Sequence, residues 1–330
     1  MKRFVLLILV CIGICLLAKS SAEFISIEEY MENSANLEAF DEEIVNELSS
    51  SYYVIDGVLF QDHVLMRYPA LKTADLYSIP EGTVSIDLNA FAHVKIGTIS
   101  KIYLPSSCID LGYPIGPEWW LEYLGGVTDI NVDSQNPCFS SENGLLLSKD
   151  RDTLLFYPRG RNDKVFEIPE GVRYIANGAC MACDFEKVVF SESVLQIGDY
   201  AFYQNQLDSI VFNDQLSYIG VGAFEASASL ESITIPKGVD KIDYNAFAAC
   251  STLHHVQIDE GVREIEDYAF WGSPISNMYL PASLTQIGDI IACDKEDEND
   301  CLPCTYYVPQ NSYALKWVIE NGFTYMIDGK

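Results

Sequence analysis

The chain has 330 residues, 49% of them hydrophobic, which is enough apolar material for a sizeable core and argues against a disordered protein. Its 48 Asp and Glu residues outnumber its 20 Lys and Arg residues, giving a formal net charge of −28 at pH 7. Because nucleic acids are bound by basic surfaces, this charge excludes DNA and RNA as expected partners.

The first residues have the pattern of an export signal. The basic start Lys2-Arg3 precedes an apolar run over residues 4–18, and the small residues Ser20-Ser21-Ala22 follow it. The run is too short for a membrane-spanning helix, and the residues before its two cysteines are too large for lipid attachment. We therefore expect residues 1–22 to be a signal peptide. The mature chain should be secreted or peripherally attached to the cell surface, without a membrane span.

Residues 23–51 are acidic and helical in pattern. Ser26 and Glu29 fit a capping box, in which two side chains satisfy free N–H groups at a helix start. Four apolar residues then recur at helical spacing: Leu37, Phe40, Ile44 and Leu48. Such a segment covers the open apolar end of a repeat array, or it forms a separate helix that binds a partner. We expect the first role, a helical N-terminal cap.

Residues 52–69 predict a β-hairpin, because β-prone runs flank the turn signal Asp56-Gly57. A similar module recurs over residues 138–158, around Asn143-Gly144. Both modules end in Tyr-Pro and lead into Ile-Pro-Glu-Gly at a common offset, so the chain carries a long internal duplication.

An insertion over residues 112–126 separates the two modules, together with two repeat units. Pro117 near its start and Gly125 at its end predict a short helix that carries Trp119 and Trp120. These indole rings either pack onto the core or stack on a sugar or protein partner. We keep both alternatives and name the two tryptophans as candidate ligand-binding residues.

The second half of the chain repeats with a period of 22 or 23 residues. Each unit contains Leu-x-x-Ile-x-Ile or a close variant, an isoleucine seven residues further on, and an Ala-Phe pair at plus eleven and twelve. The last apolar residue of the first motif recurs at Ile168, Phe190, Phe212, Ile235, Ile258 and Leu280. Such a period is typical of a solenoid, in which stacked coils bury apolar residues that no single coil can bury. We expect a solenoid over residues 52–304 and a C-terminal cap over residues 305–330.

The repeat also predicts where side chains point. Phe202, Phe224, Phe247 and Phe270 should form a ladder of rings in the interior. Strand alternation turns the residues between the apolar positions of Leu-x-x-Ile-x-Ile outward. Any solenoid has such a face, so a structural role is the alternative to a binding role. The outward rows give our remaining candidate ligand-binding residues: Lys187, Ser209, Ser232, Thr234, His255, Gln257, Asn277 and Tyr279.

Eight cysteines follow the signal, an even number that permits disulfides in an exported protein. We expect at least one disulfide among Cys293, Cys301 and Cys304, which lie close in sequence, and name Cys108 and Cys138 as further candidates. The repeat places Cys183 and Cys250 at a buried turn position, where we expect structural thiols.

Metal and catalytic sites find little support in the sequence. The two Cys-x-x-Cys pairs, at Cys180 and Cys301, are five coils or roughly 24 Å apart, too far to share a zinc ion. The acidic residues 289–300 leave calcium binding open, although they lack the glycine of an EF-hand loop. None of the four histidines lies near a Gly-x-Ser-x-Gly motif. We expect no catalytic residue, no metal and no cofactor.

The repeat, with Ile-x-Ile-Pro, Val-x-x-Ile and Ala-Phe-x-x-Cys or Asn, resembles the BspA-like leucine-rich repeats of bacterial surface and secreted proteins. Residues 233–239 and 246–250 match it fully, whereas Cys180 replaces the phenylalanine and Cys108 replaces a valine. The resemblance covers about residues 52–330. It implies an α/β, β-rich, right-handed solenoid with a parallel sheet on one face, short hairpin insertions and terminal caps.

The resemblance also implies a function in adhesion or recognition. We expect an extracellular, non-catalytic monomer that binds a host or bacterial surface protein or a glycan. A carbohydrate-active enzyme and a purely structural surface element remain the alternatives.

Overall fold

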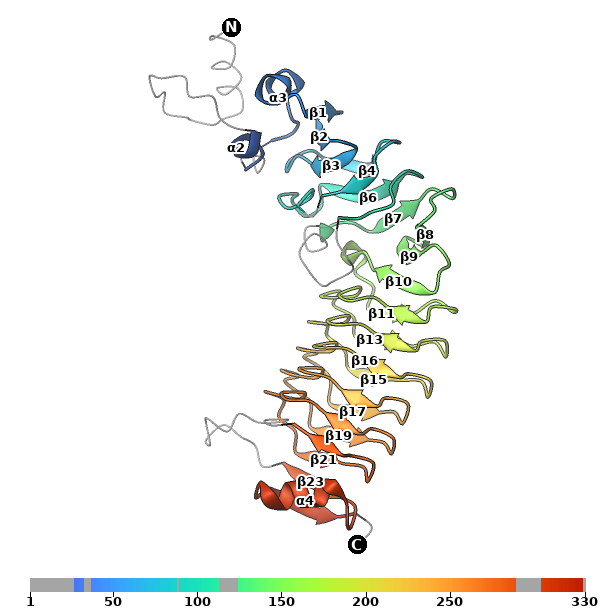
Figure 1. The fold of residues 1–330 in the computed structure, drawn as a ribbon, viewed down its shortest axis with the longest axis vertical. Helices are drawn as coiled ribbons and strands as arrows, with labels where there is room; N and C mark the ends of the chain where they lie inside the picture. The colour runs from blue at the N-terminus through green and yellow to red at the C-terminus, as the bar shows by residue number, and fades with distance from the viewer. Residues whose placement is uncertain (1–26, 33–36, 88, 113–123, 289–303, 329–330) are drawn as a thin grey trace, which may run out of the picture. The chain divides into compact units, whose positions relative to one another are not determined.

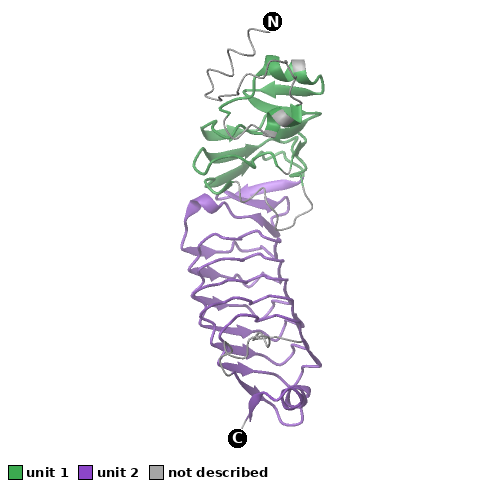
Figure 2. Cartoon of the chain, turned by 90° about the vertical axis from the view of Figure 1, so that its left-hand side faces the viewer, with its two compact units in different colours: residues 1–113, 119–137 green, residues 114–118, 138–330 purple. Residues whose placement is uncertain are grey.

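The computed structural model of the chain describes residues 27–32, 37–87, 89–112, 124–288 and 304–328 (Figure 1). The chain divides into two compact units, one over residues 1–113 and 119–137 and the other over residues 114–118 and 138–330 (Figure 2). Several features expected from the sequence lie outside the described residues: the signal peptide, Trp119, Trp120, Cys293, Cys301 and the acidic residues 289–300.

The described part of the first unit contains two short helices, α2 (Ile27–Glu32) and α3 (Glu42–Leu48). Asp41 is the N-cap of α3: its backbone is extended, and its Oδ1 accepts two N–H groups of the first turn at 2.9 and 3.1 Å. Leu37 and Phe40 are buried but precede α3, so they do not share a helix with the apolar residues that follow. The helical spacing of the four apolar residues therefore predicted too long a helix, because α3 begins only after its N-cap, Asp41.

Two small sheets complete the described part of the first unit. Gly57 forms the first turn, because its φ of 73° is left-handed and a Cβ there would lie 2.6 Å from Ala39 Cβ. One sheet joins antiparallel strands and one parallel neighbour: β1 (Tyr52–Ile55), β2 (Val58–Gln61), β3 (Val64–Arg67) and β5 (Ser85–Ile86). The other is parallel: β4 (Ala74–Ser78), β6 (Ile99–Leu104) and β7 (Asp129–Val132).

The second unit opens with a similar antiparallel module: β8 (Phe139–Glu142), β9 (Leu145–Ser148) and β10 (Thr153–Phe156). From β10 onward the pairing is parallel, and two-residue strands, one in each coil, extend the sheet to nine strands. Each of these strands ends in a buried isoleucine, the plus-seven residue of the repeat. They are β12 (Tyr174–Ile175), β14 (Gln196–Ile197), β16 (Tyr218–Ile219), β18 (Lys241–Ile242), β20 (Glu264–Ile265) and β22 (Gln286–Ile287).

Longer parallel strands occupy another side of each coil (Figure 1). Three form one sheet: β11 (Val165–Glu167), β13 (Lys187–Val189) and β15 (Ser209–Val211). Five form the next: β17 (Ser232–Ile235), β19 (His255–Ile258), β21 (Asn277–Tyr279), β23 (Thr305–Val308) and β24 (Thr324–Ile327). Exposed and buried residues alternate along β17 and β19, as the repeat predicts. The second unit is a parallel β-solenoid, and the expected fold class is confirmed.

The phenylalanines of the Ala-Phe pairs form the ladder expected from the sequence. Phe202 stacks on Phe224 with ring centroids 5.3 Å apart, Phe224 on Phe247 at 5.4 Å, and Phe247 on Phe270 at 5.5 Å. All four rings are buried and close to parallel, so each stacked pair joins two neighbouring coils. Cys180 takes the position of the ring in the coil before Phe202 and is also buried.

A buried polar side chain lies three residues after each phenylalanine of the ladder. Asn205 Nδ2 donates to Cys180 O at 2.9 Å, one coil back along the chain. Ser273 Oγ donates to Phe247 O at 2.9 Å, and Cys250 Sγ donates to a carbonyl of the preceding coil at 3.4 Å. These bonds satisfy buried backbone carbonyls between coils. Cys250 therefore has the structural role that the repeat predicted for it.

Helix α4 (Tyr313–Glu320) closes the C-terminal end of the second unit's core. Ser312 is its N-cap and accepts a backbone N–H of the first turn at 3.0 Å. On its buried side, the Trp317 ring lies 5.6 Å from that of Tyr306 and 5.0 Å from that of Phe323. In the described part of the chain, no helix is both long and apolar enough to cross a membrane.

Candidate interaction surface

The outward residues of the longer strands form two rows. Because these strands pair in parallel register, equivalent residues lie side by side, as Ser232, His255 and Asn277 do in the first row. Thr234, Gln257 and Tyr279 are paired in the same way in the second row. The eight strand residues predicted from the sequence are all exposed or half-buried: Lys187, Ser209, Ser232, Thr234, His255, Gln257, Asn277 and Tyr279.

These residues are divided between two sheets, which the repeat alone did not indicate. Lys187 and Ser209 lie on the three-stranded sheet, beside the exposed side chains of Val189 and Val211. The other six lie on the five-stranded sheet. The hydrogen-bonded ladder is interrupted between β15 and β17, which coincides with the first 23-residue step of the repeat.

Two further strands extend this surface beyond the residues found from the sequence. Thr305 of β23 pairs with Asn277, and Tyr307 pairs with Tyr279. Strand β24 continues both rows with Thr324 and Met326. The segment between β22 and β23 interrupts the repeat and so hid this continuation. The β-prone run Thr-Tyr-Tyr-Val of β23 was the available sequence signal. In the structure its second and fourth residues are buried, as in β17 and β19 of this sheet.

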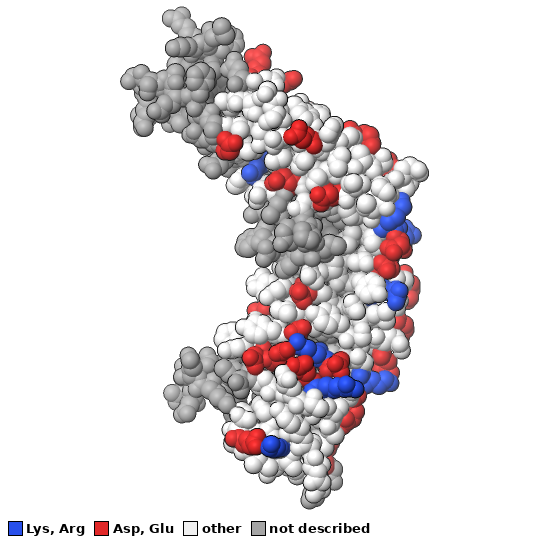
Figure 3. Space-filling model, viewed as in Figure 1, with Lys and Arg blue, Asp and Glu red and all other residues white. Residues whose placement is uncertain are grey.

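The five-stranded sheet differs in charge from the rest of the chain. Strands β17, β19, β21, β23 and β24 contain no Asp, Glu, Lys or Arg residue, although the chain carries a formal charge of −28. On the face of the molecule drawn in Figure 3, Lys and Arg side chains lie among Asp and Glu side chains rather than in a separate basic patch. The outward face of this sheet therefore offers hydrogen-bonding groups without ionic ones.

Contacts within the rows restrict what this face can do. The rings of Tyr279 and Tyr307 stack with centroids 4.3 Å apart and an angle of 11°, so their shared faces are closed to a ligand. Asn277 Nδ2 lies 3.2 Å from His255 Nδ1. When this amide donates, the imidazole keeps its proton on Nε2, where it can donate to a bound molecule.

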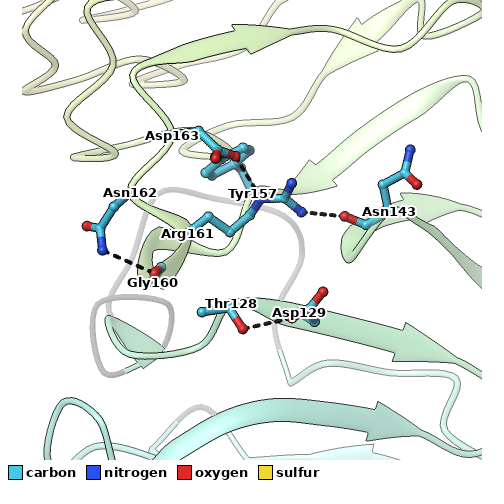
Figure 4. Close-up of polar contacts among 8 residues, drawn as sticks. All are labelled: Thr128, Asp129, Asn143, Tyr157, Gly160, Arg161, Asn162 and Asp163. Carbon is cyan, nitrogen blue, oxygen red and sulfur yellow. Dashed lines mark hydrogen bonds and ion pairs between the residues drawn. The ribbon is translucent and has the colours of Figure 1, made fainter.

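A separate polar cluster surrounds Tyr157 (Figure 4). Tyr157 Oη donates to Asp163 Oδ2 at 2.5 Å, Arg161 Nε donates to the same oxygen at 2.9 Å, and Arg161 Nη1 donates to Asn143 O. The hydrogen bond from Tyr157, followed by that from Arg161, holds the pKa of Asp163 below its usual value. Burial and then the bond to Asp163 raise the pKa of Tyr157. The cluster ties η3 (Arg159–Arg161) to the turn between β8 and β9, and we assign it a structural role.

Four of the described cysteines give no sign of a reactive site. Cys180, Cys183 and Cys250 are buried thiols, and Cys304 is a half-buried thiol. Burial raises the pKa of Cys183, Cys250 and Cys304 to about 12, so these groups are protonated and poorly nucleophilic at neutral pH.

The disulfides expected through Cys293 and Cys301 lie outside the described residues, and a disulfide of Cys108 or Cys138 stays a prediction. Among the residues that the structure describes, no group of three or more His, Cys, Asp and Glu side chains could hold a metal ion. His254 Nδ1 contacts Pro274 O at 2.8 Å, a contact that supplies neither a nucleophile nor an orienting carboxylate.

The strand order, the parallel register and the Ala-Phe ladder define a β-solenoid of the leucine-rich-repeat type. Residues 173–294 match the family model of the BspA type leucine rich repeat region, in six copies. This match confirms the resemblance seen in the sequence, and the repeats over these residues belong to that family. None of the curated proteins compared with the chain matches it.

Solved structures of bacterial leucine-rich-repeat proteins are similar to the chain. One from Eubacterium ventriosum has a TM-score of 0.52 and 22% identity, over 66% of this chain and 64% of that one. The pneumococcal vaccine antigen PcpA has a TM-score of 0.48 and 19% identity, over 75% and 60% of the two chains. A leucine rich cell surface protein from Faecalibacterium prausnitzii has a TM-score of 0.37 and 16% identity, over 79% and 88%. The chain therefore spans less than two thirds of the first two proteins, and the likeness concerns the fold alone.

Proposed function

We propose that this protein is a secreted or surface-attached recognition protein that binds a protein or glycan through the outward face of β17, β19, β21, β23 and β24. The observation that carries the proposal is the absence of charged residues from these five strands in so acidic a chain. A partner can approach such a face without displacing water from unpaired charges, which would cost binding free energy. The BspA-type repeats and the export signal support an extracellular location.

The test uses residues 23–330 as an immobilised bait for protein and glycan arrays. For a partner found in this way, lysine replaces His255, Gln257, Asn277 and Tyr279 together, and we expect binding to be lost. The matched control replaces four exposed glutamines outside these strands with lysine, which changes the net charge equally: Gln135, Gln196, Gln215 and Gln286.

Three outcomes separate the proposal from its alternatives. Equal binding by a folded strand-face variant and the glutamine control would move the site elsewhere, with Trp119 and Trp120 as the next candidates. An absence of any partner would favour a purely structural surface element. Turnover of a polysaccharide by the purified chain would establish a carbohydrate-active enzyme instead.

A further inference from the structure

A second surface of the solenoid carries aromatic rings that the core does not use. It is formed by the turns over residues 198–206, 220–229, 243–252 and 266–274, which we call the turn face. The phenylalanines of these turns point inward and form the ladder. Five other aromatic side chains remain, of which Tyr244 is 43% and Trp271 39% exposed and the rest are half-buried: Tyr200, Tyr203, Tyr244, Tyr268 and Trp271.

These rings form two angled pairs that are brought together across the coils. The rings of Tyr200 and Tyr203 lie 5.9 Å apart at 82°, and those of Tyr244 and Tyr268 lie 5.4 Å apart at 62°. Gly222 occupies the coil between the pairs, where a Cβ would lie 2.4 Å from Tyr200 Cε1. The absence of a side chain at Gly222 therefore lets the Tyr200 ring lie over this coil. Burial raises the pKa of Tyr200, and the neighbouring Tyr244 adds to this rise.

The backbone at two of these tyrosines is unusual. Tyr200 has a φ of 54° and Tyr268 a φ of 60°, in the left-handed region that is unfavourable for residues with a Cβ. The equivalent positions of other coils hold Gly178, Gly222 and Asn245, which tolerate this conformation better. The backbone conformation therefore gives no reason for tyrosine at these turns. The reason must lie with the rings, which contact one another and are partly exposed at the surface.

The charge of the turn face has one sign. The four turns contain five carboxylates and no Lys, Arg or His residue: Asp199, Glu225, Asp243, Glu266 and Asp267. Lys241, from the neighbouring strand, pairs with Asp243 at 3.5 Å and with Glu266 at 2.5 Å. The face remains net negative after this pairing. Glu225 is half-buried, and a Cβ at Gly222 would lie 3.0 Å from Glu225 Oε2 as well as 2.4 Å from Tyr200 Cε1, which places a carboxylate beside the rings.

We propose that the turn face binds a basic segment of a protein partner, with arginine or lysine side chains placed on the tyrosine and tryptophan rings. The face of an aromatic ring attracts a cation within about 6 Å of its centre, and Tyr and Trp are the most effective side chains for this contact. Carboxylates beside the rings add charge complementarity to the same cation. This surface is distinct from the uncharged strand face, so either can bind without the other.

The test measures binding of a labelled peptide in which arginine alternates with glycine and serine, by fluorescence anisotropy at about 0.15 M salt. Residues 23–330 should bind this peptide and should not bind the same peptide with citrulline in place of arginine. Citrulline has nearly the shape of arginine but no charge. The double variant Tyr244→Leu/Trp271→Leu keeps the net charge and should weaken binding about 5- to 30-fold, from the loss of two cation–π contacts.

A matched control separates the aromatic contribution from general attraction to an acidic protein. Tyr313→Leu/Tyr325→Leu removes two rings of similar exposure, 40% and 41%, away from the turn face and should leave binding unchanged. Tyr244→Phe/Trp271→Phe keeps ring faces and should retain most of the affinity. Circular dichroism checks the fold, and the single leucine variants, each about 2- to 5-fold weaker, replace the double one if it fails to fold.

Four results would overturn the proposal. They are no binding of the arginine peptide, equal binding of the citrulline peptide, equal affinity of the turn-face and control leucine variants, and capture of a neutral glycan by the turn face without capture of the arginine peptide.

Discussion

Truncation of one ring in the phenylalanine ladder tests how the coils hold each other. Phe247 is fully buried and stacks on Phe224 at 5.4 Å and on Phe270 at 5.5 Å. A buried phenylalanine removes about 150–250 Å² from water, an upper limit of about 4–6 kcal/mol at 25 cal/mol per Å². Measured losses for such truncations are about 3–5 kcal/mol, and we expect this range for Phe247→Ala.

The ladder supplies its own matched control. Among the described aromatic rings, Phe270 stacks on Phe247 alone. Phe270→Ala should therefore cost less than Phe247→Ala, by the one missing stacking contact of about 0.5–1.5 kcal/mol. Urea unfolding followed by circular dichroism gives both free energies of unfolding.

Hydrogen exchange shows how far the damage spreads. Because stability in a solenoid is coupled between neighbouring coils, Phe247→Ala should reduce amide protection in the coils of Phe224 and Phe270 more than in that of Ile175. A loss below about 1 kcal/mol would show that Phe247 does not support the core. Equal costs at Phe247 and Phe270 would refute the stacking argument.

Three further predictions concern single side chains. Tyr157→Phe should lower the free energy of unfolding by about 1 kcal/mol, because it removes the hydrogen bond to the partly exposed carboxylate of Asp163. Tyr68→Phe is the control: it removes a buried hydroxyl without a hydrogen-bond partner and should cost nothing in the same urea assay. Because the folded-state pKa of Asp163 is lowered, its contribution is complete above the unfolded pKa and is lost as pH falls below about 5, so acid titration should destabilise the wild type more than Tyr157→Phe. The Cys250 thiol, buried and with its pKa raised to about 12, should resist alkylation at pH 8 until the chain unfolds, as peptide mass mapping can show; rapid labelling of the native protein would contradict its burial.

The sequence predicted the interior of the solenoid better than its outside. Interior residues such as Ile242, which recurs in all six coils, and Phe247, which recurs in four, are repeated because each must meet its equivalents in the neighbouring coils. Tyr244, on the turn face, has no such constraint and differs from coil to coil, so periodicity could not reveal it. The repeat also failed at β23, where an insertion breaks the spacing although Tyr306 still occupies an interior position.

Local signals were available for part of what was missed. Asp41 followed by two glutamates is a typical helix start, and it explains why the N-terminal helical pattern divides into α2 and α3. The split of the outward rows between two sheets had no such signal. It falls at the first 23-residue step of the repeat, although the later return to 22 residues, from Ile258 to Leu280, leaves β19 and β21 paired.

The bonds from Asn205, Cys250 and Ser273 all run in one direction, from each coil to a carbonyl of the coil before it. Such a side chain can therefore find its partner as soon as the preceding coil is in place. It then completes that coil, as Ser273 does by bonding the Phe247 carbonyl and the Cys250 N–H. A ribosome releases the chain in the same order, N-terminus first. The array is thus suited to being built one coil at a time during synthesis, each finished coil acting as the template for its successor.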